Sequence, residues 1–145
     1  MTLCTADAIR AFCHPPIVSR TLSQLRTHAA AQHFAVSAYC FLPARICLVI
    51  VGTKDDADLK KMIFQFRQAA ALGYWQATGF ILWQSGYFVQ VLHDEQEALA
   101  MCRTVITAPI RAGLTRMVGQ YPFAGSDVYR LADLEDRSDQ HACWY

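Results

Sequence analysis

Residues 35–52, AVSAYCFLPARICLVIVG, contain two runs rich in apolar, β-branched and aromatic residues, separated only by Pro43 and Ala44. Two such runs joined by so short a connection predict a β-hairpin. The second run, residues 45–52, is largely apolar on both faces, which is typical of a strand in the interior of a sheet. We therefore expect the chain to fold around a sheet that contains this hairpin.

One helix is predicted on each side of the hairpin. The first lies within residues 14–34 and starts at a Pro-Pro pair. Its apolar residues recur at helical spacing: Val18, Leu22, Leu25 and Ala29. The second is capped by Asp56 or Asp58 and is expected to stop at Gly73. Its predicted buried stripe consists of Leu59, Met62, Ile63, Phe66, Ala69 and Ala70.

Further elements flank this central part. Residues 2–5 are a candidate strand, and residues 79–93 are a further extended segment in which Gly86 suits a bulge or bend. A third helix is predicted from Asp94, because Glu97 three residues later resembles a capping box, and Pro109 is expected to end or kink it. The order β-α-β-β-α-β followed by a helix predicts an α+β fold. It is a ferredoxin-like antiparallel sheet with helices on one face and an extra C-terminal helix.

The chain of 145 residues suits one domain with its own core. We place this domain at residues 1–125 and expect residues 126–145, which include EDRSDQ, to form a loosely packed tail. Apolar residues make up 54% of the chain, but no apolar run approaches the roughly 18–20 residues of a membrane helix. The first ten residues lack the pattern of a secretory signal. These features predict a cytoplasmic protein without a membrane partner.

Charge and ligand-type residues give no strong signal. The net charge of +1 provides no general argument for a polyanionic partner, although it leaves room for a local basic patch. The six cysteines form no C-x-x-C pair, and the five histidines form no H-x-H or H-E-x-x-H. The sequence therefore predicts neither a metal site nor a disulfide framework.

Three stretches follow one another along nearly the whole chain: AYCFLPARICLVIVG, FRQAAALGYWQATGFILWQSGYFVQVLHDEQEAL and VITAPIRAGLTRMVGQYPFAGSDVY. Together they resemble the REP-associated tyrosine transposases and the related HUH insertion-sequence transposases. The resemblance implies the ferredoxin-like fold already derived. It also implies recognition of hairpin or single-stranded DNA, and strand cleavage and transfer that use a divalent metal such as Mg²⁺ or Mn²⁺.

The same resemblance locates the family's working residues. The two metal-binding histidines of the family correspond to Arg45 and Cys47. The nucleophilic tyrosine corresponds to Thr104, and an asparagine four residues later to Ala108. Because a site that acts as a unit has changed at every member, the resemblance implies that the fold is kept without its reaction. We expect no catalytic residue, no metal and no cofactor.

DNA binding does not require that reaction, because recognition of phosphates needs cations rather than a catalytic centre. Arg45 puts a cation where the family holds a metal, and a guanidinium offers two donors to a phosphate. The candidate DNA-contacting residues are Arg45, Lys60, Lys61, Arg67, Gln84, Arg103, Arg111 and Arg116.

Two alternatives stay open. In the first, the chain is a protein-interaction or homodimerising module that no longer binds DNA, which its high apolar content favours. In the second, it is an active transposase that uses a non-standard site. Tyr74, Tyr87 and Tyr121 are then candidate nucleophiles, although each also suits a packing role.

Overall fold

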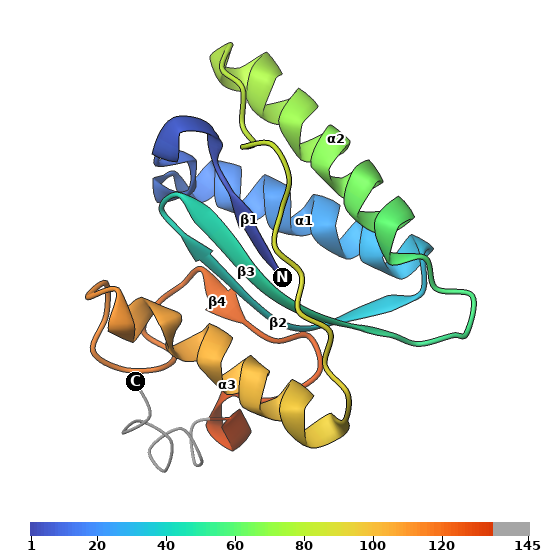
Figure 1. The fold of residues 1–145 in the computed structure, drawn as a ribbon. Coiled ribbons are helices and arrows are strands. Elements are labelled where there is room, and N and C mark those ends of the chain that lie inside the picture. Colours follow the sequence, from blue (N-terminus) through green and yellow to red (C-terminus); the bar gives the residue numbers. More distant parts are fainter. Residues whose placement is uncertain (135–145) are drawn as a thin grey trace.

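The computed structural model describes residues 1–134 of the chain (Figure 1). Its strands are β1 (Thr2–Cys4), β2 (Phe34–Leu42), β3 (Arg45–Gly52) and β4 (Ala124–Gly125). Its helices are α1 (Pro15–Ala31), α2 (Leu59–Thr78) and α3 (Glu95–Arg111), and two short 3-10 turns, Ala6–Ala8 and Ala11–Cys13, join β1 to α1. Within the described residues, each helix is too short or too polar to span a lipid bilayer.

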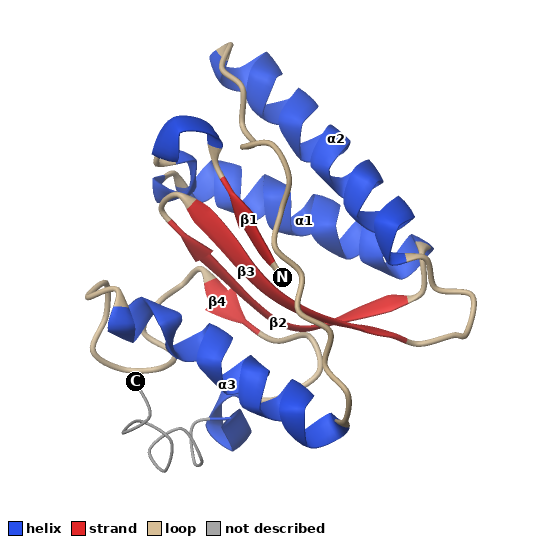
Figure 2. Ribbon diagram, in the orientation of Figure 1, coloured by secondary structure: helices blue, strands red, loops and turns tan. Residues whose placement is uncertain are grey.

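The predicted hairpin is confirmed, and it forms the middle of the sheet (Figure 2). The strands are antiparallel in the order β1-β3-β2-β4, so β3 has a neighbour on each side. The two-residue turn pairs Leu42 with Arg45, and the register that follows places Cys40 opposite Cys47. The ladder shifts by one residue between Val36 and Ala38, which is a β-bulge.

The sheet carries helices on both faces (Figure 1). Helices α1 and α2 cover one face, where Ile46 and Leu48 of β3 join a first core. Helix α3 covers the other face, where Cys40 and Val49 join a second core. Alternate residues of a strand point to opposite faces, so the apolar run of β3 contributes to both cores. The α+β fold with two helices on one face is confirmed, and the extra helix lies on the opposite face.

Residues 80–93, which we call the strap, run along the outer edge of β1. Thr2 and Phe88 exchange two backbone hydrogen bonds of 2.8 and 3.0 Å. The amide of Gln84 donates to the Cys4 carbonyl at 3.0 Å. Residues 85–87 between these pairs face Leu3 alone, and Gly86 has a φ of 74°, so the predicted bulge is present. The predicted extended segment thus pairs with β1 at isolated points rather than as a regular strand.

The expected end of the second helix at Gly73 is wrong, because α2 continues to Thr78 and stops at Gly79, with a φ of 77°. Gly73 instead lies where α2 passes close to α1. A Cβ atom there would lie 3.4 Å from Nε of Arg20 and 3.5 Å from Nε2 of Gln24. The predicted cap is confirmed at Asp58, which accepts a hydrogen bond from the Lys61 amide at 3.1 Å.

The capping box of α3 is confirmed at its start, since Asp94 accepts from the Glu97 amide at 2.8 Å. Pro109 does not end the helix, which runs on to Arg111. Gly113, with a φ of 75°, ends it: its amide bonds the Ile110 carbonyl, and the Leu114 amide bonds the Pro109 carbonyl at 2.9 Å. These two bonds form a Schellman motif, which satisfies carbonyls that the helix end leaves free.

The segment after α3 adds contacts that were not predicted. Strand β4 pairs with β2 at Tyr39 and Cys40. Ser126 donates to the Ser37 carbonyl at 2.6 Å, and Leu134 is fully buried in the second core. Residues 126–134, assigned from sequence to a loosely packed tail, thus pack against the sheet and the second core. The rest of that tail, residues 135–145, lies outside the described residues.

Candidate functional site

The positions that the resemblance assigns to the metal ligands and the nucleophile lie on the face of the sheet that α3 covers. Cys47 of β3 and Ala108 of α3 belong to the same second core. Arg45 lies two residues before Cys47 on the same face of β3 and is exposed. Thr104 is one helical turn before Ala108, and its hydroxyl donates to the Ala100 carbonyl at 3.1 Å. The fold therefore gathers residues from two distant stretches.

The centre of this region is a pair of thiols, of which Cys40 is buried and Cys47 is partly buried. Cys40 and Cys47 are directly opposite in the β2–β3 ladder. Burial raises the pKa of Cys40 to about 12; the nearby Cys47 adds to the rise, and Arg45 and Arg111 oppose it. Burial also raises the pKa of Cys47, against the opposing effect of Arg45. Both groups are consequently neutral thiols near pH 7, whereas a metal ligand or nucleophile needs the thiolate.

Two guanidinium groups flank these thiols. Arg45 and Arg111 both favour the thiolate of Cys40 by their charge, so both lie near it. They come from different elements, the first residue of β3 and the last of α3. Arg111 is positioned by hydrogen bonds of 2.8 Å to the Thr104 carbonyl and to the Thr107 hydroxyl. The site thus combines neutral thiols inside with two cations toward solvent.

A phenol also reaches this region. Tyr121 packs against the second core, and its hydroxyl donates to the Phe41 carbonyl at 2.6 Å. Burial, together with Cys40 and Cys13, raises its pKa to about 12, which disfavours the phenolate that would attack phosphorus. Tyr121 therefore acts as a structural hydrogen-bond donor.

The other two tyrosines that were considered as nucleophiles are engaged elsewhere. Tyr74 of α2 is only 5% exposed and belongs to the first core. The ring centroid of Tyr87, a residue of the strap, lies 5.4 Å from the guanidinium carbon of Arg67. Both lie away from the thiol pair, because α2 covers the opposite face of the sheet and the strap lines its edge. Of these three tyrosines, Tyr121 is the one that lies beside the thiol pair.

A second group of predicted DNA-contacting residues lies on α2 and the strap. Lys60 and Lys61 are exposed in the first turn of α2. Arg67 donates to the Gln84 carbonyl at 2.7 Å and stacks 5.9 Å from the Trp83 ring. The Trp83 indole in turn donates to the Arg67 carbonyl at 3.0 Å. The group therefore includes two exposed lysines and one arginine whose guanidinium group contacts the strap.

The eight predicted residues consequently do not form one surface. Lys60, Lys61, Arg67 and Gln84 lie with α2, whereas Arg45, Arg103 and Arg111 lie with α3 on the other side of the sheet. Arg103 is buried, with 8% of its surface exposed, so little of it can reach a phosphate. Arg116 is exposed in the turn region after α3.

Local signals could have revealed part of this arrangement. A two-residue turn at Pro43 and Ala44 already pairs residue 42 with 45, and therefore Cys40 with Cys47. The pairing of these two cysteines was nevertheless not predicted from the sequence. The approach of Tyr121 to the thiols has no such local signal, because it depends on how the chain returns after α3. Among the described residues, no group of three or more His, Cys, Asp or Glu is placed to hold a metal ion.

Comparison with known proteins gives one informative result. The fold is similar to a solved structure of a REP-associated tyrosine transposase bound to a REP hairpin, with a TM-score of 0.72. The match covers 85% of this chain and 72% of the other, at 13% sequence identity. No protein-family model and no curated protein sequence matches the chain. At this identity the comparison supports the fold, which is that of a transposase-like α+β domain.

Proposed function

We propose that this chain binds the phosphates of hairpin or single-stranded DNA and does not cleave the strand. The observation that carries the proposal is the placement of Arg45 and Arg111, two exposed arginines from different elements, near the buried Cys40. Guanidinium groups bind phosphate oxygens through paired, charge-assisted hydrogen bonds. The similarity of the fold to a transposase bound to a DNA hairpin supports the choice of DNA over other phosphate ligands.

Two side chains at this site support the proposed lack of cleavage. Strand cleavage by this route needs an activated hydroxyl, and Thr104 donates its proton within its own helix, to Ala100. Tyr121 holds its proton more tightly than an ordinary tyrosine and donates it to Phe41.

Binding of this kind should be weak and sensitive to salt. Two arginines neutralise few phosphates, and the net charge of +1 adds no long-range attraction. For two phosphate contacts on single-stranded DNA, the logarithm of the association constant should fall with the logarithm of salt concentration with a slope of about −1.4.

Fluorescence anisotropy with a labelled hairpin, its unpaired strand and a perfect duplex, over a salt series, tests the proposal. We expect the hairpin and the single strand to bind at low salt and to dissociate as salt rises. Absence of binding to all three at the lowest salt would reject DNA binding. A second assay mixes the protein with a single-stranded suicide substrate and Mg²⁺ or Mn²⁺. A covalent protein–DNA adduct on a denaturing gel would reject the lack of cleavage.

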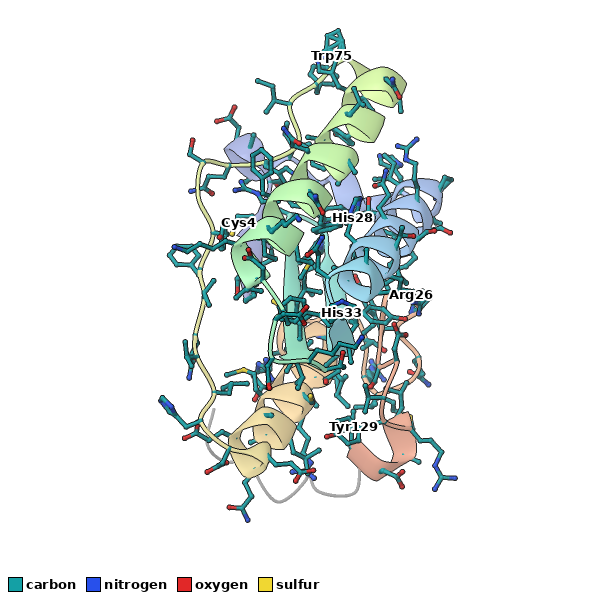
Figure 3. The ribbon with its side chains drawn as sticks, turned by 90° about the vertical axis from the view of Figure 1, so that its right-hand side faces the viewer. Cys4, Arg26, His28, His33, Trp75 and Tyr129 are labelled. Atoms are coloured by element: carbon teal, nitrogen blue, oxygen red, sulfur yellow. The ribbon has the colours of Figure 1, made fainter. Side chains whose placement is uncertain are left out.

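A second candidate function, homodimerisation, is favoured by exposed apolar side chains on α2. Phe64, Leu72 and Trp75 are 61%, 61% and 56% exposed. Figure 3 shows Trp75 near the end of α2, away from the sheet. Exposed aromatic and aliphatic side chains on one helix are typical of an interaction surface. Light scattering over a range of concentrations should then show a dimer that the substitution Trp75→Ser weakens, and a monomer throughout would reject this candidate.

A further inference from the structure

The sheet contains a gap between β3 and the strap. The β1–β3 ladder stops at Met1 and Leu48, which exchange two backbone hydrogen bonds of 2.9 Å. The β1–strap pairing stops at Thr2 and Phe88. Beyond these pairs β3 and the strap both continue, and a groove of about 950 Å³ lies between them. We call this groove, which lies between residues 49–52 and 89–92, the gap.

Where β1 ends, the space between β3 and the strap is as wide as one strand. At Thr2, β1 fills the place between β3 and the strap, and neighbouring strands lie about 4.8 Å apart. The two walls are therefore separated by about 9.6 Å where β1 occupies the space. Past Met1 the same walls, with Val49 and Ile50 on one side and Val89 and Gln90 on the other, line the open groove.

Backbone groups face into the gap from both walls. In an antiparallel ladder a residue directs both its N–H and C=O to one side, and residues two apart face the same side. Leu48 bonds toward β1, so Ile50 faces the gap. Phe88 bonds toward β1, so Gln90 faces the gap from the strap. Within residues 1–134 neither ladder continues past these pairs, which leaves two hydrogen-bonding edges opposite each other.

We propose that the gap binds an extended peptide segment of a partner protein, added to the sheet in line with β1 and antiparallel to both walls. The backbone edges select an extended chain, since only a strand can bond to β3 and the strap at once. This proposal concerns a site separate from the DNA site and does not depend on it.

The lining indicates what side chains the peptide carries. Leu59 lies on the α2 side of the gap, and Ala98 and Met101 of α3 lie on the other side. Apolar residues on either face of the peptide would therefore meet apolar surface. Asp94 and Glu95 line the far end, where the N-terminal end of a peptide parallel to β1 would lie. A basic residue at that end of the peptide complements them.

The probe for the test is the acetylated hexapeptide Lys-Val-Thr-Val-Thr-Val, with its C-terminus amidated and a fluorophore attached. Two further versions carry N-methyl groups, one on the second, fourth and sixth residues and one on the third and fifth. A peptide held between two strands uses N–H groups on both sides, so each N-methylated version should bind at least about tenfold more weakly. A peptide added to a single open edge would tolerate one of the two versions.

Two variants and a second measurement complete the test. Ala98→Trp fills the gap from α3 and should abolish peptide binding, whereas Ala100→Trp, on the exposed side of the same helix, should not. Hydrogen exchange should slow for the amides of Ile50 and Gln90 when peptide is added. The proposal is overturned if the unmodified peptide does not bind at millimolar concentration, if either N-methylated version binds equally well, or if those amides stay unprotected at saturation.

Discussion

Cys40 lies directly opposite Cys47 across the β2–β3 hairpin, on the face of the sheet that α3 covers. Cys40 has no exposed surface, and both residues pack in the second core. At the place where the family resemblance expects a metal ligand, the chain therefore has a small apolar side chain. Two charged groups, those of Arg45 and Arg111, lie at its exposed rim. This division between an apolar interior and a cationic rim underlies the predictions about binding and pH.

Replacing Arg45 with glutamine should weaken hairpin binding about tenfold, because one charge-assisted contact to phosphate is lost. The salt slope should become shallower by about 0.7 for single-stranded DNA. Lys54→Gln, an exposed change in the loop after the other end of β3, is the matched control and should leave affinity nearly unchanged. Equal effects of the two changes in the anisotropy assay would contradict a site at Arg45.

Raising the pH should destabilise the protein through its buried thiol. The pKa of Cys40 is raised in the folded state to about 12 from an ordinary value of 9.0, so folding favours the protonated form. Its contribution to stability is complete below pH 9 and is lost as the pH rises toward 12. At pH 11 the loss should be on the order of 2–3 kcal/mol.

Urea denaturation at several pH values above 8 measures this effect. Cys40→Ala should lower stability at neutral pH through the lost packing, and it should also flatten the decline at alkaline pH. Cys13→Ala, a change at an exposed thiol, should keep most of the slope of the unmodified protein. An unchanged slope in the Cys40 variant would show that other groups cause the decline. Tyr121, whose pKa is also raised to about 12, contributes with the same sign above pH 10.

Two glycines of α2 should respond to alanine in opposite directions. Gly73→Ala should raise the free energy of unfolding by about 0.5–1 kcal/mol, because glycine is unfavourable inside a helix. The new Cβ would meet only the ends of the flexible side chains Arg20 and Gln24. Gly79→Ala should lower it by about 1 kcal/mol, since the φ of 77° suits glycine. Thermal denaturation compares the two, and destabilisation by Gly73→Ala would indicate that the α1–α2 contact is tighter than described.

Gly125→Ala should destabilise the protein by about 1–3 kcal/mol, because a Cβ there would lie 2.7 Å from the Tyr39 hydroxyl oxygen. Tyr39→Phe removes that oxygen and should recover part of the loss. A double-mutant cycle by chemical denaturation isolates the coupling from the separate cost of Tyr39→Phe. Strict additivity of the two changes would mean that the crowding is relieved by movement of the backbone instead.

Much of the fold could be predicted because its signals are local. The turn at Pro43 and Ala44, the caps at Asp58 and Asp94 and the bulge at Gly86 each act within a few residues of chain. The wrong prediction concerns a position where packing against a distant segment, rather than the local residue type, decides the structure. Gly73 can end a helix, but α2 continues through it to Thr78 and packs beside α1 there.

The candidate site could be predicted only in part for the same reason. Arg45 and Cys47 share one strand face, which the alternation along β3 already implies. The face that α3 covers depends on packing between distant segments. So does the hydrogen bond from Tyr121 to the Phe41 carbonyl. The separation of Lys60 and Lys61 from Arg45 is likewise a consequence of α2 and α3 lying on opposite faces.

The sequence by itself determined the hairpin, the helix starts and the shared strand face of Arg45 and Cys47, because each is set by residue type and spacing within one short stretch. Tertiary structure alone decided that the Cys40 thiol is buried, that arginines from β3 and α3 both lie near it, and that β3 and the strap enclose a gap. Burial and proximity depend on which distant segments pack together, and no local pattern of residues encodes that.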